Sequence, residues 1–140
     1  MWIVLLFGAL SFGLAKSFCI RAVENPYAEP YLDYLLLKSV EKAVLASGYK
    51  LDCAKGSQEI SPAVELLKET PIAYTPQQRV SAYSLELKLS LRIGQERKAF
   101  SVSVPYSQPE GGVGDLPRRA ALEDALGIIY TEILQFIGRR

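Results

Sequence analysis

Histidine is absent from this chain of 140 residues. Its absence removes the commonest general base, the Ser-His-Asp and Cys-His arrangements of hydrolases, and every metal site with an imidazole ligand. The two cysteines are too few to form a zinc site by themselves. The carboxylates are spread over positions that we expect to face water, and no spacing forces two of them into the converging pair that glycan cleavage requires. We therefore expect a protein that is not an enzyme and that uses no metal ion and no cofactor.

A large net charge is also missing, because the formal value is +1 and only 22% of the residues are charged. Such a chain has no general attraction to nucleic acid or to an anionic membrane, so a basic site would have to be a local cluster. Apolar residues make up 49% of the sequence, which argues against disorder. The length supports one domain with a single two-layer core.

The N-terminus begins with an apolar run, Met1–Ala15, that ends at Lys16. About 20 apolar residues are needed to span a bilayer, so this run is short for a transmembrane helix and is typical of an export signal. Cleavage could follow Ala15 or use the small residues of Ala15-Lys16-Ser17. The alternative is a buried first strand or helix. We predict an export segment over residues 1–17 and a single domain over residues 18–140.

Export bears on the two cysteines, Cys19 and Cys53. In an oxidising compartment they could form a disulfide, which would stabilise the fold by about 3–4 kcal/mol through loop closure. They could instead remain reduced and buried as small apolar side chains. A third possibility is that Cys19 is a lipidated N-terminus, although Lys16-Ser17-Phe18 lacks the small residue expected directly before such a cysteine.

Two segments have the spacing of helices with one apolar face. The first runs from Pro30 to Ser47 and is followed by Gly48, a natural stop. The second begins near Pro117 and ends at Gly138.

Several segments are predicted to be strands. The clearest is Val80–Ile93, where apolar and polar residues alternate strictly. A turn at Gly94-Gln95-Glu96 leads to a return strand over Phe100–Tyr106, in which Pro105 favours an edge position. Shorter strands are predicted at 18–23 and 49–53, whereas 61–74 fits either a short helix or a strand.

These elements predict an α+β fold, a two-layer sandwich with two helices packed on one face of a mixed four-stranded sheet. The opposite face of the sheet is polar, so it would meet water or a partner.

The chain resembles the LPS-assembly lipoprotein family (LptE). The resemblance rests on an export signal followed by a short strand, on the Asn-Pro and Glu-Pro helix start within Asn25–Ser47, on the tyrosine-flanked hairpin of Pro71–Leu85, and on the closing helix. It implies a protein that is exported to the periplasmic side of the outer membrane, sits partly inside the β-barrel LPS translocon, assists assembly of that barrel and binds lipopolysaccharide. The sequence departs from the family in lacking the usual lipidation context before Cys19.

The resemblance also implies a lipopolysaccharide site of basic residues near the hairpin tip and the start of the last helix. The matching residues are Arg79, Arg118 and Arg119, whose guanidinium groups can grip phosphate with two hydrogen bonds each. The alternative is that these are ordinary solvated charges.

Partner contacts are predicted on the polar face of the long strand and near the hairpin tip. Glu86, Lys88 and Arg92 would meet the polar lumen of a barrel, or merely pair across strands. Tyr74 and Tyr83 would be contact aromatics, or would cap the sheet core.

A second hypothesis is an exported auxiliary subunit of an envelope lipid transporter, or a regulator of cell-wall synthesis. It rests on fold analogy alone.

Overall fold

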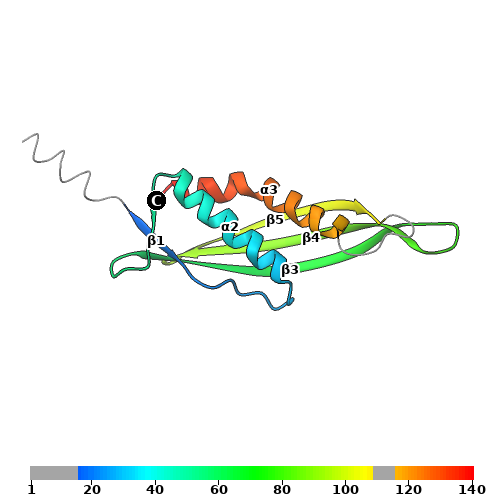
Figure 1. Ribbon diagram of the computed structural model, residues 1–140, viewed down its shortest axis with the longest axis horizontal. Coiled ribbons are helices and arrows are strands. Elements are labelled where there is room, and N and C mark those ends of the chain that lie inside the picture. Colours follow the sequence, from blue (N-terminus) through cyan, green and yellow to red (C-terminus); the bar gives the residue numbers. More distant parts are fainter. Residues whose placement is uncertain (1–15, 109–115) are drawn as a thin grey trace, which may run out of the picture.

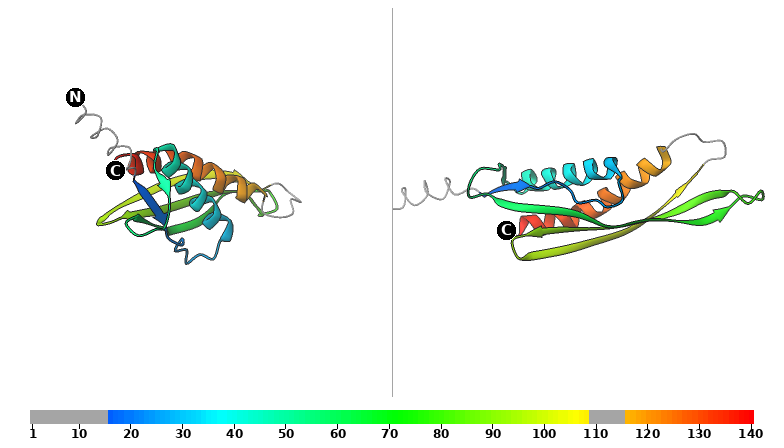
Figure 2. Two further views of the ribbon diagram at one scale, coloured as in Figure 1. Left: turned by 60° about the vertical axis from the view of Figure 1, so that its left-hand side comes forward. Right: turned by 90° about the horizontal axis from the view of Figure 1, so that it is seen from below.

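The computed structural model describes residues 16–108 and 116–140. Most of the predicted export segment therefore lies outside the described residues. The elements are β1 (Ser17–Ile20), α2 (Pro30–Ala46), β2 (Lys50–Leu51), β3 (Gln58–Tyr74), β4 (Val80–Ile93), β5 (Glu96–Ser107) and α3 (Leu116–Gly138). Figure 2 shows both helices on the same side of one sheet, which confirms the predicted α+β sandwich.

The sheet has five strands in the order β2-β1-β3-β4-β5, so the prediction of four strands is wrong by one. The additional strand is β3, a 17-residue strand that includes the stretch whose sequence fits either a helix or a strand. β1 pairs in parallel with β2 and β3, whereas β3, β4 and β5 form an antiparallel meander. β1 and β2 are shorter than the sequence indicates, with four and two residues.

Proline explains why β3 is hard to recognise. Pro62 and Pro71 both lie within the strand, although proline is rare in central strands because it has no N–H donor. β1 ends at Ile20, so most of β3 has no full neighbour on that side. Pro62 has no N–H to donate there, but its carbonyl oxygen accepts a hydrogen bond from the Glu24 N–H at 3.1 Å.

The helix boundaries follow the sequence signals closely. Pro30 opens α2, which ends at Ala46 rather than Ser47, and Gly48 follows with a φ of 81° that favours glycine. α3 begins at Leu116, one residue before Pro117, and ends at Gly138 as predicted.

One core lies between the helices and the sheet. The alternating residues of β4 supply its centre, since Leu85, Leu87, Leu89 and Leu91 are at most 1% exposed. Fully burying one leucine side chain contributes about 1.5–3 kcal/mol. The core is completed by buried residues of the helices and other strands: Phe18, Leu32, Leu36, Val40, Ala43, Val44, Ile60, Val64, Ile93, Phe100, Val104, Ala121, Leu122, Ala125, Leu126, Ile129, Ile133, Phe136 and Ile137.

The sheet is longer than the helices that cover it. The β3–β4 hairpin projects past the ends of both helices (Figure 1). We call residues 70–84 the hairpin extension, and none of its residues is buried. The remainder of the sheet, together with the two helices, is the covered half. No helix within the described residues is long and apolar enough to cross a membrane.

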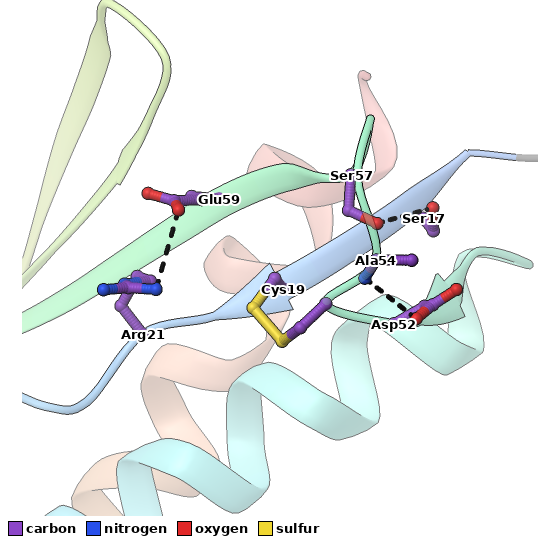
Figure 3. Close-up of a disulfide and its surroundings, with 8 residues drawn as sticks. Ser17, Cys19, Arg21, Asp52, Ala54, Ser57 and Glu59 are labelled. Carbon is purple, nitrogen blue, oxygen red and sulfur yellow. Dashed lines mark hydrogen bonds and ion pairs between the residues drawn. A yellow bond between two sulfur atoms is a disulfide. The ribbon is translucent and has the colours of Figure 1, made fainter.

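A disulfide joins Cys19 and Cys53, as Figure 3 shows, so the paired reading of the two cysteines is confirmed. It links β1 to the segment that follows β2, at the end of the molecule opposite the hairpin tip. Ser17 and Ser57 add a hydroxyl–hydroxyl hydrogen bond of 3.0 Å nearby. A bonded Cys19 has no free thiol to acylate.

Candidate functional site

The tip of the hairpin is a tight turn between Thr75 and Arg79. The Thr75 N–H donates to the Arg79 carbonyl oxygen at 2.8 Å, and the Arg79 N–H donates to the Thr75 hydroxyl at 3.2 Å. Gln78 adopts a φ of 66° in this turn. The turn presents the Arg79 side chain to solvent. Ile72 and Tyr74 lie beside it with 54% and 62% of their surface exposed, so the tip combines one cation with two exposed apolar side chains.

Arg118, the second predicted lipopolysaccharide contact, is already engaged within the protein. Its Nε donates to Glu69 Oε1 at 2.8 Å, and its Nη1 donates to Glu29 Oε2. Its side chain is only 23% exposed. Burial acts to lower the pKa of Arg118, but the hydrogen bond to Glu29 and the attraction of Glu69 outweigh burial and raise it. Arg118 therefore joins the start of α3 to β3 and to the start of α2.

Tyr106 belongs to the same network. Burial, then the hydrogen bond that its hydroxyl donates to Glu69 at 2.7 Å, raises the pKa of Tyr106. The Tyr106 ring stacks on Tyr83 with 5.4 Å between centroids. Tyr83 is therefore half-buried against Tyr106, where the covered half meets the hairpin extension.

Arg119, the third predicted contact, is exposed. Its guanidinium group lies 4.3 Å from the centroid of the Tyr31 ring. The Tyr31 hydroxyl donates a hydrogen bond to Glu123. This hydrogen bond is the main cause that raises the pKa of Tyr31. Arg119 and Arg79 are therefore the two predicted lipopolysaccharide contacts that are exposed. The start of α3, where Arg119 lies, is the end of that helix nearer the hairpin tip (Figure 1).

The sheet face opposite the helices carries the predicted partner residues of β4. Lys88 and Arg92 are exposed and Glu86 is half-buried. Glu86 lies opposite Lys68 of β3 and Ser103 of β5. A shallow hollow of about 340 Å³ is lined on this face by Leu66, Glu86, Lys88, Ser101 and Ser103, among others. We call this surface the open face. At this hollow β5 contributes the small polar residues Ser101 and Ser103.

An irregularity in β3 creates a second polar cluster on the open face. The register shifts between Val64 and Leu66, and the intervening Glu65 accepts hydrogen bonds from Ser90 Oγ at 2.6 Å and Arg97 Nη2 at 2.7 Å. These two bonds, with Ser90 the larger cause, lower the pKa of Glu65. Ser90 is the one buried polar residue in the described core, and Glu65 satisfies it.

Sequence reasoning missed both carboxylate networks. It placed Glu65 and Glu69 among scattered solvent-facing acids, because the 61–74 stretch fits a helix as well as a strand. As a strand, Glu69 pairs with Leu85 and so falls on the side of the sheet that the helices cover. Glu69 lies on the same face of the sheet as the buried leucines of β4. A carboxylate at such a position needs a cation beside it, and this is the signal that could have identified Glu69 as the partner of Arg118.

The chain can now be compared with known proteins. No family model matches the chain. A protein of Aquifex aeolicus (strain VF5), described as uncharacterized, is 38% identical over 128 residues, covering 91% of this chain and 88% of that protein.

Three solved bacterial proteins, two of them lipoproteins, share the fold at low sequence identity. Rare lipoprotein B of Shewanella oneidensis has a TM-score of 0.52 and 15% identity, with 89% of this chain and 95% of that chain covered. A minor lipoprotein of Acinetobacter baumannii has a TM-score of 0.51 and 12% identity, covering 88% and 93% of the two chains. A Xanthomonas campestris protein of the DUF330 family has a TM-score of 0.58 and 16% identity, covering 88% and 83%. The chain belongs to the family of the Aquifex aeolicus protein, and its fold is that of solved bacterial lipoproteins.

Proposed function

We propose that this protein is an exported factor on the periplasmic side of the outer membrane. In this role it binds lipopolysaccharide and assists, and partly plugs, the β-barrel translocon that inserts lipopolysaccharide. The observation that carries the proposal is the hairpin extension, a run of 15 residues (70–84) without a buried side chain that continues the sheet past the helices. A two-stranded hairpin gains little stability by itself. Its exposed Ile72 and Tyr74 therefore favour a partner that covers them.

A barrel lumen suits this surface in shape and chemistry. The interior of an outer-membrane barrel is polar, and the open face carries Glu86, Lys88, Ser101 and Ser103 around its hollow. The disulfide supports export, because disulfides persist in oxidising compartments. The fold shared with solved bacterial lipoproteins supports a place in the cell envelope.

Lipopolysaccharide binding would rest on Arg79 and Arg119. Both guanidinium groups are exposed. Arg118 is held by Glu29 and Glu69, so its role in the proposed site is to position the start of α3.

The translocon proposal is tested by affinity purification from detergent-solubilised native outer membranes. We expect a large β-barrel protein to co-purify, and a variant with the tip residues Ile72 and Tyr74 both changed to serine to lose it. A protein recovered alone from the soluble fraction would contradict the proposal. Recovery with an inner-membrane complex would favour the auxiliary lipid-transporter hypothesis.

The lipid site needs a separate experiment. Replacing Arg79 and Arg119 with alanine should weaken binding of purified lipopolysaccharide by about tenfold or more, because each loss removes charge-assisted hydrogen bonds. Tm should fall by no more than about 5 °C, the loss expected from the Arg119 contact with the Tyr31 ring. Arg21→Ala is the matched control, since Arg21 is an exposed arginine at the disulfide end. An unchanged affinity in the double variant would refute this site.

A further inference from the structure

The outer edge of β5 has no neighbouring strand within the described residues, because β5 is the last strand in the sheet order. Lys98 and Pro105, residue types that hinder pairing at the edges of natural sheets, lie near its two ends. The residues between them, 99–104, carry no charge and no proline, and small side chains alternate with apolar ones. This stretch is therefore an edge that another strand can join.

Three residues of this stretch direct backbone groups away from β4. The β4–β5 register runs without a shift, and in continuation of it the Gln108 N–H donates to the Ser81 carbonyl oxygen at 2.8 Å. Hydrogen-bonded and non-hydrogen-bonded pairs alternate in an antiparallel ladder, so the even-numbered residues of β5 hold the bonds to β4. The N–H and C=O groups of Ala99, Ser101 and Ser103 therefore point to the free edge, and all three residues are exposed.

α3 runs along this edge on the helical side of the sheet. Near its C-terminus Phe136 packs against Phe100, with 6.2 Å between ring centroids. Near its N-terminus Arg118 shares the carboxylate of Glu69 with Tyr106. The helix is therefore antiparallel to β5, and the middle of α3 lies level with the middle of the strand.

The side of α3 that faces away from α2 carries an exposed apolar residue between two acids. Tyr130 contacts Lys42 of α2, and Ile128, two residues earlier, is turned from Tyr130 by about 200° around the helix. Ile128 is 60% exposed. Asp124 and Glu132, four residues before and after it, are exposed on the same side and form no ion pair with another described residue.

We infer that the free protein pairs with a second copy of itself through the β5 edge, by antiparallel strand addition about a two-fold axis at Ser101. In this register Ala99 lies opposite Ser103 of the second copy, so their outward N–H and C=O groups satisfy one another. Pro105, which has no N–H, lies opposite Arg97 at the end of the pairing, where its missing donor interrupts nothing.

The charges favour a second copy over an unrelated strand. Lys98 pairs with the buried Leu91 of β4, so its side chain starts on the helical side of the sheet, and it forms no ion pair with another described residue. In the register about Ser101, Lys98 of one copy lies opposite Val104 of the other. That position is at the Asp124 end of α3, so the second copy supplies the cation that the acidic side of α3 lacks.

The pairing uses the backbone edge of β5 and the outer side of α3. It leaves the hairpin extension free and does not rest on the proposed translocon role. The two sheets form one continuous sheet with both helical layers on the same side, and the two Ile128 side chains lie on the sides of α3 that face the axis.

Sedimentation equilibrium of the native protein, purified from the envelope, tests the inference. We expect a monomer–dimer equilibrium. Ser101→Pro should raise the dissociation constant about tenfold or more, because each copy loses the hydrogen bond that it donates at the axis. The Ser101 N–H faces away from β4, so the circular dichroism spectrum should be unchanged. Ser101→Ala is the matched control and should dimerise like wild type. A native protein that stays monomeric, or equal dissociation constants for the two variants, would overturn the inference.

Cysteine crosslinking tests the register. Ser101→Cys places two thiols at the axis with their Cα atoms about 5.5 Å apart, within the range that a disulfide spans. Ser103→Cys, on the same edge and also exposed, is the control, because its two thiols lie about 13 Å apart along the strands. Under mild oxidation only Ser101→Cys should yield a covalent dimer on a non-reducing gel. Equal yields would contradict the proposed pairing.

Charge reversal identifies the partner as a second copy. Lys98→Glu and Asp124→Lys should each raise the dissociation constant by about threefold to tenfold, because each sets like charges against one another across the axis. The double variant restores opposite charges across the axis, so its dissociation constant should return towards the wild-type value. Losses that simply multiply in the double variant would overturn the inference.

Discussion

The same two strands, β3 and β4, behave differently in the covered half and in the hairpin extension. Under the helices, Leu85, Leu87, Leu89 and Leu91 alternate with polar residues and are buried. Beyond the helices, Ile72 and Tyr74 belong to the same strand pair but remain more than half exposed. Strand pairing alone therefore does not bury apolar side chains. Apolar side chains are buried only where a second layer of structure covers the sheet. Within the described part of the chain, no helix covers the hairpin extension.

The largest expected effect comes from the covered half. Leu89→Ala should lower the free energy of unfolding by about 2–5 kcal/mol, because it leaves a cavity between helices and sheet. The matched change Ile72→Ala in the extension should alter it by at most about 0.5 kcal/mol in the isolated protein. Urea unfolding monitored by circular dichroism measures both. Similar losses for the two variants would remove the distinction between the halves.

The disulfide end gives the next effect. Breaking the Cys19–Cys53 bond should lower the free energy of unfolding by about 3–4 kcal/mol, because its sequence separation of 34 residues closes a long loop in the unfolded chain. The double Cys19→Ser and Cys53→Ser variant gives the value by urea unfolding. Two free thiols in the mass spectrum of the native protein would contradict this bond.

Arg118 marks the junction between the two regions, and its removal should have an intermediate effect. Arg118→Met leaves the carboxylates of Glu29 and Glu69 without their cation, which should cost about 1–3 kcal/mol. Arg119→Met, which removes an exposed contact with the Tyr31 ring, should cost only about 0.5–1 kcal/mol. Thermal unfolding of the two variants separates them, and equal values would argue against a structural role for Arg118.

The smallest effect depends on pH and concerns Glu65 on the open face. Ser90 and Arg97 lower the pKa of Glu65 in the folded state, so its stabilisation is present above the ordinary carboxyl pKa and is lost as pH falls through the lowered value. Glu65→Gln should therefore reduce stability at neutral pH by less than about 1 kcal/mol, because Arg97 is partly exposed. The difference from wild type should vanish in acid.

Glu59→Gln is the control for that titration. Glu59 pairs with Arg21 at 3.6 Å on a well-exposed surface. We expect its stability difference from wild type to stay near zero across the same pH range. A pH dependence equal to that of Glu65→Gln would show that the Glu65 cluster is not the cause.

The parts of the fold that could be predicted are those where one local signal dominates. The strict alternation of Val80–Ile93 indicates a half-buried strand and nothing else. The proline starts and glycine stops of α2 and α3 locate the helices to within a residue or two.

The remainder depends on contacts between distant segments. β3 contains Pro62 and Pro71, which are tolerated because β1 is too short to pair with the whole strand. The length of that pairing is set by the tertiary structure and is not visible in the local sequence. The pairing of Arg118 with Glu29 and Glu69 spans three elements, so no spacing in the sequence reveals it. The site prediction located Arg79 and Arg119 at the surface but could not foresee that Arg118 is already neutralised.

The central claim is that the hairpin extension and open face meet a translocon barrel while the outer helix surface does not. Photoactivatable residues at Tyr74 and Lys88, with Ile128 on α3 as the control of similar exposure to Tyr74, test it in living cells. The account predicts crosslinks to one β-barrel protein from Tyr74 and Lys88 and none to that protein from Ile128. Crosslinks to the barrel from Ile128 alone, or from none of the three positions, would contradict it.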